Sequence, residues 1–347
     1  MSEPTTAETH QTILATLAED YAMGEAEVTR LPIGQGTVNY RAAWRGRDYF
    51  VKHYPAGTDL DAESQAIDLT DLAARHEVPT PGLVRTRQGQ AISHRDNVAV
   101  SVWEWVRGHT VTDGFTPAQQ EAAGAALGRI HHAFATHPDS ARTSPELETW
   151  LHPDVTGIED TITDLLERVA QRDHRDDFDH LAEQTLTERR HALREVPALL
   201  DGLPVMTTQV LHGDYSAVNL LFDGERLSAV TDFRPPEPFL IAYELGRIAF
   251  DPRTVVLDEN WITAASRLVA AYLDTNPAVR GEDVRACARV ALLQLLRSLY
   301  GVKQHYRKPG LYQKDLDDFW LLRHRASNRL LAQLDHAEAA LDEITRR

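Results

Sequence analysis

Cysteine is nearly absent from the 347-residue chain, whose only thiol is that of Cys287. A single cysteine excludes an intrachain disulfide and any zinc site built from cysteines. Lysine is almost as scarce, and most of the positive charge is carried by arginine; the lysines are Lys52, Lys303, Lys308 and Lys314. A lysine within a predicted strand is therefore a candidate functional residue.

Long apolar runs and a surplus of basic charge are also missing. No stretch approaches the roughly 18 consecutive apolar residues that a transmembrane helix requires. The N-terminal sequence MSEPTTAETHQT lacks the basic start and apolar core of a secretory signal. The net charge is −16, which argues against a basic nucleic-acid-binding surface. We therefore expect a cytoplasmic monomer or homodimer with no membrane or nucleic-acid partner.

Strand and turn signals are concentrated between residues 28 and 105. Runs of β-branched and aromatic residues, separated by glycine-containing turns, predict strands. Leu60–Arg75 has a helical pattern that ends before Pro79. The predicted strands cover Val28–Leu31, Tyr40–Trp44, Tyr49–Tyr54, Gly82–Thr86, Ala91–His94 and Asn97–Trp105. The sequence thus predicts a small β-rich lobe over residues 1–106.

Helical patterns dominate after Gly108. The run TPAQ, residues 116–119, resembles a capping box with proline at the first helical position, and it predicts a helix that continues to about Thr136. Further helices are expected at about Glu159–Gln171, Phe178–Leu200, Phe239–Phe250, Trp261–Asp274, Glu282–Tyr306 and Lys314–Arg346. We therefore expect an α+β chain whose second lobe, residues 107–347, is mostly helical.

A β-rich island interrupts the helices and carries polar residues at its ends. Leu220–Phe222 and Leu227–Thr231 flank the turn sequence DGER and predict a hairpin. Because a hairpin brings its outer ends together, Asn219 and Asp232 are expected to lie close to each other. Asp214 precedes them on the loop that leads in. Three oxygen-bearing side chains in such a place suit a hard cation such as Mg²⁺.

Asp214 and Asn219 both lie in the run HGDYSAVN, residues 212–219. It matches the H-x-D-x-x-x-x-N catalytic loop of the protein-kinase-like superfamily, and its HGD form resembles the aminoglycoside phosphotransferase and homoserine/choline kinase branch. Asp232 follows Asp214 by 18 residues, where that family has its second magnesium aspartate, and Lys52 stands where the third-strand lysine belongs. The resemblance implies a two-lobed protein-kinase-like fold.

The resemblance also implies roles for the catalytic residues. Asp214 would orient and deprotonate an acceptor hydroxyl. Asn219 and Asp232 would hold Mg²⁺ across the phosphates of a nucleoside triphosphate. Lys52 would pair with the α- and β-phosphates and would be held by a helix carboxylate, for which Glu63 is the first candidate.

Two further segments resemble nucleotide-binding elements of this branch. Gly34 and Gly36 stand in a short loop that resembles the nucleotide loop, where glycine lets backbone N–H groups approach phosphate. The run WEWVRG, residues 103–108, resembles the hinge, so backbone groups of Glu104 to Val106 would meet the adenine. The donor is expected to be ATP, with GTP left open.

The acceptor is less well defined by the sequence. An amino-bearing compound such as an aminoglycoside-type antibiotic or an amino sugar is favoured, which would imply antibiotic resistance. A metabolic kinase of homoserine, choline or a similar alcohol is the first alternative, and a catalytically silent kinase-like binding protein is the second. The chain departs from the family after Asp232. The family usually has a Gly-Asp-Pro stretch before Tyr-Asp-Leu, whereas this chain has FLI, residues 239–241, followed by AYEL, residues 242–245. The run RPP, residues 234–236, is also unusual so close to the expected metal ligand.

Two other polar groups have simple structural interpretations. His131, His132 and His137 lie on or just after a predicted helix without a carboxylate at ligand spacing, so core or solvated histidines are expected there. The acidic run QRDHRDDFD, residues 171–179, is expected to be a solvated loop between helices, with recruitment of a cationic acceptor as the alternative.

Overall fold

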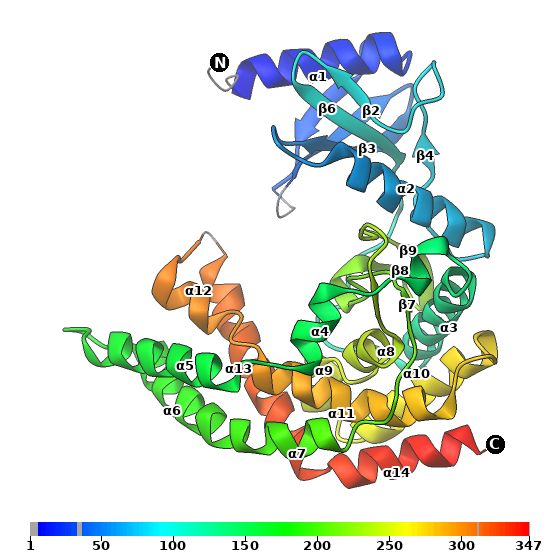
Figure 1. Ribbon diagram of the computed structural model, residues 1–347. Coiled ribbons are helices and arrows are strands. Elements are labelled where there is room, and N and C mark those ends of the chain that lie inside the picture. The colour runs from blue at the N-terminus through cyan, green and yellow to red at the C-terminus, as the bar shows by residue number, and fades with distance from the viewer. Residues whose placement is uncertain (1–5, 33–36, 311, 347) are drawn as a thin grey trace. The chain divides into compact units, whose positions relative to one another are not determined.

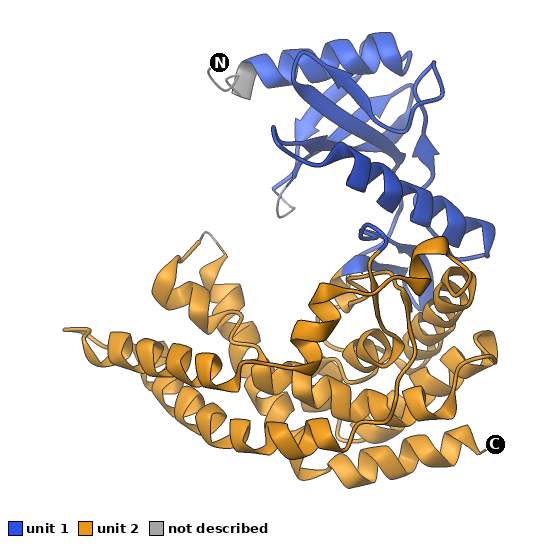
Figure 2. Ribbon diagram, viewed as in Figure 1, with its two compact units in different colours: residues 1–109, 219–236 blue, residues 110–218, 237–347 orange. Residues whose placement is uncertain are grey.

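A computed structural model describes residues 6–32, 37–310 and 312–346 of the chain. The chain forms two compact units (Figures 1 and 2). Unit 1 combines residues 1–109 with 219–236, and unit 2 combines residues 110–218 with 237–347. The chain therefore passes from one unit to the other three times.

An antiparallel sheet forms the centre of unit 1 (Figure 1). Its strands follow the order β1-β2-β3-β6-β4, and β5 also pairs with β6. The strands are β1 (Glu27–Arg30), β2 (Val38–Trp44), β3 (Arg47–Tyr54), β4 (Leu83–Val84), β5 (Ser93–Arg95) and β6 (Val98–Glu104). This sheet and the mostly helical second unit confirm the predicted α+β class.

Two helices accompany the sheet. The apolar side chains of Ile13 and Leu17 on α1 (Thr6–Asp20) share a buried core with Val51 and Val100 of the sheet. Helix α2 (Leu60–Arg75) begins after Asp59, whose carboxylate accepts the backbone N–H groups of the first turn. The resulting first turn of α2 carries Glu63.

The predicted hairpin is confirmed and consists of β8 (Leu220–Asp223) and β9 (Arg226–Val230). It is hydrogen-bonded to the N-terminal part of unit 1, because His109 and Phe222 exchange two backbone hydrogen bonds of 2.9 Å and the N–H of Val230 donates to Pro79 at 2.8 Å. Gly108 permits this approach, since a Cβ there would lie 3.1 Å from the carbonyl oxygen of Phe222.

Unit 2 is mostly helical. Its α3 begins with the predicted capping box, in which Thr116 and Gln119 satisfy each other's backbone N–H groups. A Cβ at Gly124 of α3 would collide with the carbonyl oxygen of Leu268, so glycine allows α3 and α10 to pack closely. The elements are α3 (Pro117–Phe134), α4 (Pro145–Leu151), α5 (Val155–Ala170), α6 (Asp177–Ala192), α7 (Val196–Asp201), β7 (Thr208–Val210), β10 (Pro238–Leu240), α8 (Ile241–Ala249), α9 (Pro252–Leu257), α10 (Trp261–Thr275), α11 (Gly281–Arg297), α12 (Val302–Arg307), α13 (Gln313–Ala332) and α14 (Leu334–Thr345).

Several helices expected to be continuous are divided, and those predictions are wrong. The helix predicted over Glu282–Tyr306 is divided into α11, which ends at Arg297, and α12, which begins at Val302. Gly301 lies between them with a φ of 101°, and a Cβ at this position would lie 2.6 Å from the carbonyl oxygen of Leu316. The helix predicted over Lys314–Arg346 is divided at Gln333 into α13 and α14. Proline near the start of α7 separates it from α6, and the segment that begins at Phe239 first forms β10.

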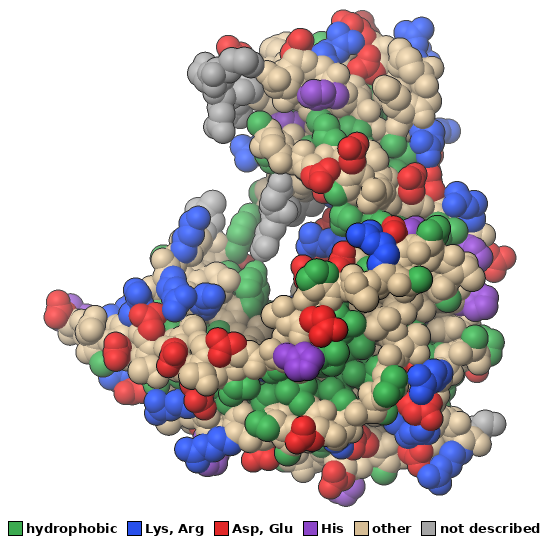
Figure 3. Space-filling view, in the orientation of Figure 1, with side chains coloured by type: hydrophobic (Ala, Val, Ile, Leu, Met, Phe, Trp, Pro, Cys, Tyr) green, Lys and Arg blue, Asp and Glu red, His purple; other side chains and the backbone are tan. Residues whose placement is uncertain are grey.

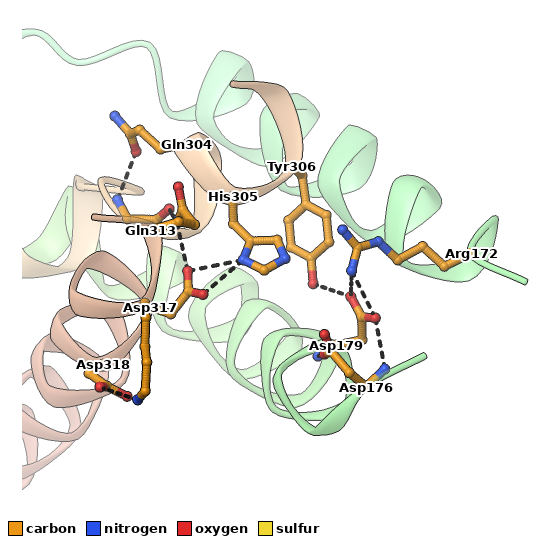
Figure 4. Close-up of polar contacts among 11 residues, drawn as sticks. Arg172, Asp176, Asp179, Gln304, His305, Tyr306, Gln313, Asp317 and Asp318 are labelled. Carbon is orange, nitrogen blue, oxygen red and sulfur yellow. Dashed lines mark hydrogen bonds and ion pairs between the residues drawn. The ribbon is translucent and has the colours of Figure 1, made fainter. Parts of the chain in front are cut away.

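The acidic run at residues 171–179 is also not simply a solvated loop. Its last residue, Asp179, is fully buried in the first turn of α6. The Asp179 carboxylate accepts hydrogen bonds from Arg172 at 3.1 Å and from the Tyr306 hydroxyl at 2.7 Å (Figure 4). The neighbouring His305 lies 2.9 Å from Asp317. This cluster ties the tip of α5 and α6 to α12 and α13, with the Asp179 carboxylate paired to Arg172 and Tyr306.

The surface has no simple charge segregation on the face shown in Figure 3, where acidic and basic side chains are interspersed. Within residues 6–32, 37–310 and 312–346, no helix is both long enough and apolar enough to cross a membrane.

Candidate active site

Lys52 of β3 links two carboxylates in unit 1. Its ammonium lies 3.4 Å from Oε2 of Glu63 on α2 and 3.4 Å from Oδ1 of Asp232. Strand pairing fixes the position of Lys52, which lies opposite Ser101 of the central strand β6. The structure thus brings together three residues that are predicted separately from distant parts of the sequence.

Asn219 and Asp232 lie at the open end of the β8–β9 hairpin. The backbone N–H of Thr231 donates to the carbonyl oxygen of Asn219 at 2.9 Å, which extends the pairing beyond the strands and places Asp232 one residue further. Asn219 is buried, whereas the side chain of Asp232 is 56% exposed. Asp232 has a φ of 66°, a left-handed conformation that is costly for a residue with a side chain. Aspartate adopts this region more readily than most residues do, and such conformations recur both at turns and at functional sites.

The donor chemistry of this end of the hairpin fits Mg²⁺. A carboxamide oxygen and an exposed carboxylate are hard oxygen ligands. In the described ranges no group of three or more His, Cys, Asp or Glu side chains could hold a metal ion. Two protein ligands suit a cation that keeps water or phosphate oxygens in its other positions, as Mg²⁺ does.

The predicted nucleotide-binding segments are described only in part. Gly34 and Gly36 lie outside the described residues. At the end of β6 the N–H of Glu104 donates to Gly82 at 2.7 Å, so that donor is already used. Within the part of the chain that the structure describes, the N–H of Val106 makes no hydrogen bond and remains available to a ligand.

Asp214 lies in unit 2 on the loop between β7 and the hairpin. Its carboxylate forms an ion pair with Arg247 of α8, at 2.6 Å between Oδ1 and Nη2. Its backbone N–H donates to Nδ1 of the buried His212 at 3.2 Å. His212 therefore supports the shape of the loop, as expected for a structural histidine.

Glu244 of α8 is not among the site residues predicted from the sequence, although it organises the same loop. Its carboxylate accepts backbone N–H groups from His212 at 3.1 Å, Gly213 at 2.8 Å and Tyr215 at 3.4 Å. A fourth contact, at 3.0 Å, comes from Nε2 of His131. One buried carboxylate thus satisfies three donors of a tight loop that has no regular secondary structure to pair with.

The charge of Glu244 is stabilised by its partners. Burial alone would raise the pKa of Glu244, but the hydrogen bond from His131 and the electrostatic interactions with His131 and His212 hold that pKa below its usual value. His131 is fully buried, and its other ring nitrogen lies 2.9 Å from the hydroxyl of Tyr272. The sequence signal for Glu244 is a single acidic residue within the apolar run IAYELG, at the place of the aspartate in the family's Tyr-Asp-Leu stretch.

We compared the chain with models of protein families, with curated proteins and with solved structures. A family model described as "Phosphotransferase enzyme family" matches residues 27–286. A search of curated proteins finds no match. The structure is similar to an amicoumacin kinase in complex with AMP-PNP, Ca²⁺ and Ami, at 14% identity over 92% of this chain and 93% of the other, with a TM-score of 0.62.

Two further solved structures have the same fold. A spectinomycin phosphotransferase in complex with ADP and spectinomycin is 12% identical over 92% of this chain and 98% of the other, with a TM-score of 0.63. A microcompartment-associated aminopropanol kinase is 15% identical over 93% of this chain and 98% of the other, with a TM-score of 0.58. At these identities the structures establish a shared two-lobed kinase-like fold.

Proposed function

The chain belongs to the phosphotransferase enzyme family, and from that premise we propose that it transfers the γ-phosphoryl group of ATP to a hydroxyl group of a small molecule. The observation that carries the proposal is the position of Lys52 within 3.4 Å of both Glu63 and Asp232. A lysine held between a helix carboxylate and the proposed metal ligand is the arrangement that phosphate positioning requires.

The nucleotide is bound by unit 1 in this proposal. Lys52 pairs with the α- and β-phosphates, and Glu63 holds its ammonium in place. The backbone N–H groups at Gly34 and Gly36 approach the phosphates, and the backbone at Glu104 and Val106 meets the adenine. ATP is favoured over GTP because similar structures contain AMP-PNP or ADP.

Asn219 and Asp232 are the proposed ligands of Mg²⁺. When bound, the cation neutralises charge that develops on the phosphate oxygens during transfer. The presence of Ca²⁺ with AMP-PNP in a similar structure supports a divalent cation. The strained backbone of Asp232 would direct its carboxylate toward that ion.

Asp214 acts as the general base. It accepts the proton of the acceptor hydroxyl, whose oxygen forms a bond to the γ-phosphorus while the bond from that phosphorus to the ADP oxygen breaks. Arg247 and the loop held by Glu244 keep the Asp214 carboxylate in a defined position.

Amino-bearing antibiotics and amino sugars are the first acceptors to test, and a role in antibiotic resistance would follow from their turnover. The names of two similar structures support this choice. A small amino alcohol is the second candidate, supported by the similar aminopropanol kinase. The proposal places the enzyme in the cytoplasm as a monomer or homodimer that needs neither membrane nor nucleic acid.

The test is a screen for ADP release with Mg²⁺ and ATP against two panels, with ³¹P spectra of the products. One panel contains amino-bearing antibiotics and amino sugars, and the other contains homoserine, choline, ethanolamine and aminopropanol. We expect turnover in the first panel that depends on Asp214. Turnover in the second panel alone would replace the antibiotic assignment with a metabolic one. Binding of Mg²⁺ and ATP without phosphorylation of any compound would favour a silent binding protein and overturn the proposal.

A further inference from the structure

Tyr54 lies beside Lys52 on one face of the sheet in unit 1. The two residues are two positions apart on β3, so their side chains project from the same face of the strand. The ammonium of Lys52 lies over the ring of Tyr54, 5.6 Å from the ring centroid, within the roughly 6 Å over which an aromatic face attracts a cation. The ammonium thus has a neutral contact in addition to the carboxylates of Glu63 and Asp232.

The two carboxylates hold the ammonium loosely. Each lies 3.4 Å from Nζ, whereas a strong hydrogen bond between an ammonium and a carboxylate spans about 2.7–2.9 Å. The side chain of Glu63 is 26% exposed and that of Asp232 is 56% exposed, so water weakens both ion pairs. Asp232 is also the proposed metal ligand, and a bound cation would compete with Lys52 for its oxygens. A further contact therefore restricts the flexible stem of Lys52 where the ion pairs do not.

The ring of Tyr54 is fixed at its far end by strand β6. Ser101 Oγ lies 2.9 Å from the Tyr54 hydroxyl, and either oxygen can be the donor. The same Oγ accepts the indole N–H of Trp103 at 2.9 Å. Ser101 is fully buried and Tyr54 is 2% exposed, so loss of the hydrogen bond between them would leave a buried polar group unsatisfied. Two hydrogen bonds thus connect the ring beside Lys52 to a second aromatic side chain.

The core of unit 1 does not explain this hydrogen-bonded group. The buried core on the other face of the sheet contains Val100 and Val102, which flank Ser101 in β6. Ser101 is a polar residue within the otherwise apolar run VAVSVW, residues 98–103. Its hydroxyl is therefore directed away from that core and toward the face that carries Tyr54.

Tyr54 offers Lys52 a neutral surface. Burial raises the pKa of Tyr54, so the phenol stays protonated at neutral pH. The face of the ring attracts the ammonium through its quadrupole and, at 5.6 Å from the centroid, leaves the three N–H donors free for other partners. A carboxylate in the same place would accept those donors and compete with a phosphate. The ring therefore restricts Lys52 without occupying the hydrogen bonds that a nucleotide would use.

We propose that Tyr54 is a positioning residue for Lys52, and that Ser101 and Trp103 hold its ring in the required orientation. The inference rests on the proposed function, because it takes Lys52 as the residue that pairs with the α- and β-phosphates. The ring restricts the ammonium before the nucleotide binds, so less conformational freedom is lost when the phosphates arrive. Removal of the ring should therefore weaken nucleotide binding, although Tyr54 acts only through Lys52.

The position of Lys52 can be measured directly, because lysine is so scarce in this chain. Labelling with ¹³C-lysine gives NMR signals for the ε-methylene groups, and Lys52→Met assigns the signal of Lys52 by removing it. Protons over an aromatic face resonate upfield, so the ε-protons of Lys52 should lie upfield of those of the exposed Lys303, Lys308 and Lys314. A wild-type Lys52 signal among those of the exposed lysines would overturn the inference. This measurement needs no variant at Tyr54, so it decides the question even if such a variant does not fold.

Variants then assign the upfield shift to one ring. Tyr54→Phe keeps the ring and should keep the shift, whereas Tyr54→Leu should remove it. Tyr49→Leu is the matched control and should leave the shift in place, since Tyr49 is a buried tyrosine of the same strand that belongs to the core on the opposite face. Ser101→Ala should reduce the shift, because the ring loses its anchor. A Lys52 signal that stays upfield in Tyr54→Leu contradicts the role of Tyr54, and an unchanged shift in Ser101→Ala contradicts the role of Ser101.

Isothermal titration with AMP-PNP and Mg²⁺ measures the consequence for nucleotide binding. Tyr54→Leu should bind roughly tenfold more weakly than the wild type, because a partly desolvated contact between a cation and a ring is lost. Tyr54→Phe and Tyr49→Leu should bind within about twofold of the wild type. Rescue by phenylalanine separates the effect of the ring from that of a general loss of packing. Wild-type affinity in Tyr54→Leu would overturn the inference.

The two proposals can fail separately. Phosphorylation that depends on Asp214, with a Lys52 signal and an AMP-PNP affinity that do not respond to Tyr54→Leu, would refute the positioning role and leave the phosphotransferase intact. A Lys52 signal and an affinity that both depend on Tyr54, with no phosphorylation of any acceptor, would do the reverse.

Discussion

The guanidinium of Arg247 lies 2.6 Å from the carboxylate of Asp214, and both the charge and the backbone of the Asp214 loop are held by one helix. Glu244, three positions before Arg247 on α8, accepts the backbone N–H groups of His212 and Gly213. A rigid helix thus fixes the side chain and the main chain of the proposed general base at the same time. Positioning of this kind contributes a large part of catalysis when the chemistry needs no covalent intermediate.

Asp214→Ala should abolish phosphoryl transfer and leave nucleotide binding nearly intact. The loss is expected to be roughly 10²- to 10⁴-fold, the usual contribution of a general base. Binding survives because the proposed phosphate contacts come from Lys52, Asn219 and Asp232. ADP release and titration with a fluorescent ATP analogue measure the two quantities. Turnover close to that of the wild type would show that Asp214 is not the base.

The Glu244→Ala variant should have a lower free energy of unfolding of unit 2 than the wild type. The variant leaves buried backbone donors at His212, Gly213 and Tyr215 without an acceptor, and the expected loss in the free energy of unfolding is about 3 kcal/mol. Urea titration followed by circular dichroism measures it. Glu167→Ala removes an exposed carboxylate of α5 and should leave the midpoint unchanged. Equal midpoints for the two variants would contradict the role of Glu244.

The contribution of Glu244 should depend on pH in a defined direction. Its pKa in the folded protein lies below the usual value of 4.5. The stabilisation is therefore complete above pH 4.5 and is lost as the pH falls through the lower folded-state pKa. The difference in unfolding free energy between the wild type and Glu244→Gln should shrink as the pH falls from 4.5 through the folded-state pKa. A difference in unfolding free energy that grows as the pH falls would show that folding does not lower the pKa of Glu244.

Lys52→Met should weaken phosphoryl transfer by roughly 10²-fold, because one charge that positions the phosphates is removed. Lys303→Met is the matched control, since Lys303 is exposed on α12 in unit 2. Initial rates at saturating acceptor and titration with the ATP analogue distinguish loss of transfer from loss of binding. Equal rates for the two variants would exclude a role for Lys52.

Local pattern was sufficient to predict the hairpin and therefore the end at which Asn219 and Asp232 meet. The turn sequence DGER between two β-rich runs predicts the hairpin, whereas the register shift between Leu221 and Phe222 has no signal in the sequence. The position of Lys52 within a strand was predictable for the same reason.

Contacts between distant segments were not predictable from such patterns. Glu244 holds a loop about 30 residues away in sequence. The division of the helix at Gly301 depends on the approach of Leu316, which no local signal contains. These features are produced by tertiary packing, which overrides the local preferences of each segment.

Replacing Asp232 by glycine should move stability and binding in opposite directions. Glycine adopts the φ of 66° without strain, so the free energy of unfolding should rise by about 1 kcal/mol. Binding of the ATP analogue should lose its dependence on Mg²⁺, because the proposed carboxylate ligand is gone. Asp96→Gly is the matched control, since Asp96 also has a positive φ, 46°, at a turn of unit 1. That variant should gain stability and keep Mg²⁺-dependent binding. If both variants kept Mg²⁺-dependent binding of the ATP analogue, Asp232 would be a strained turn residue and not a metal ligand.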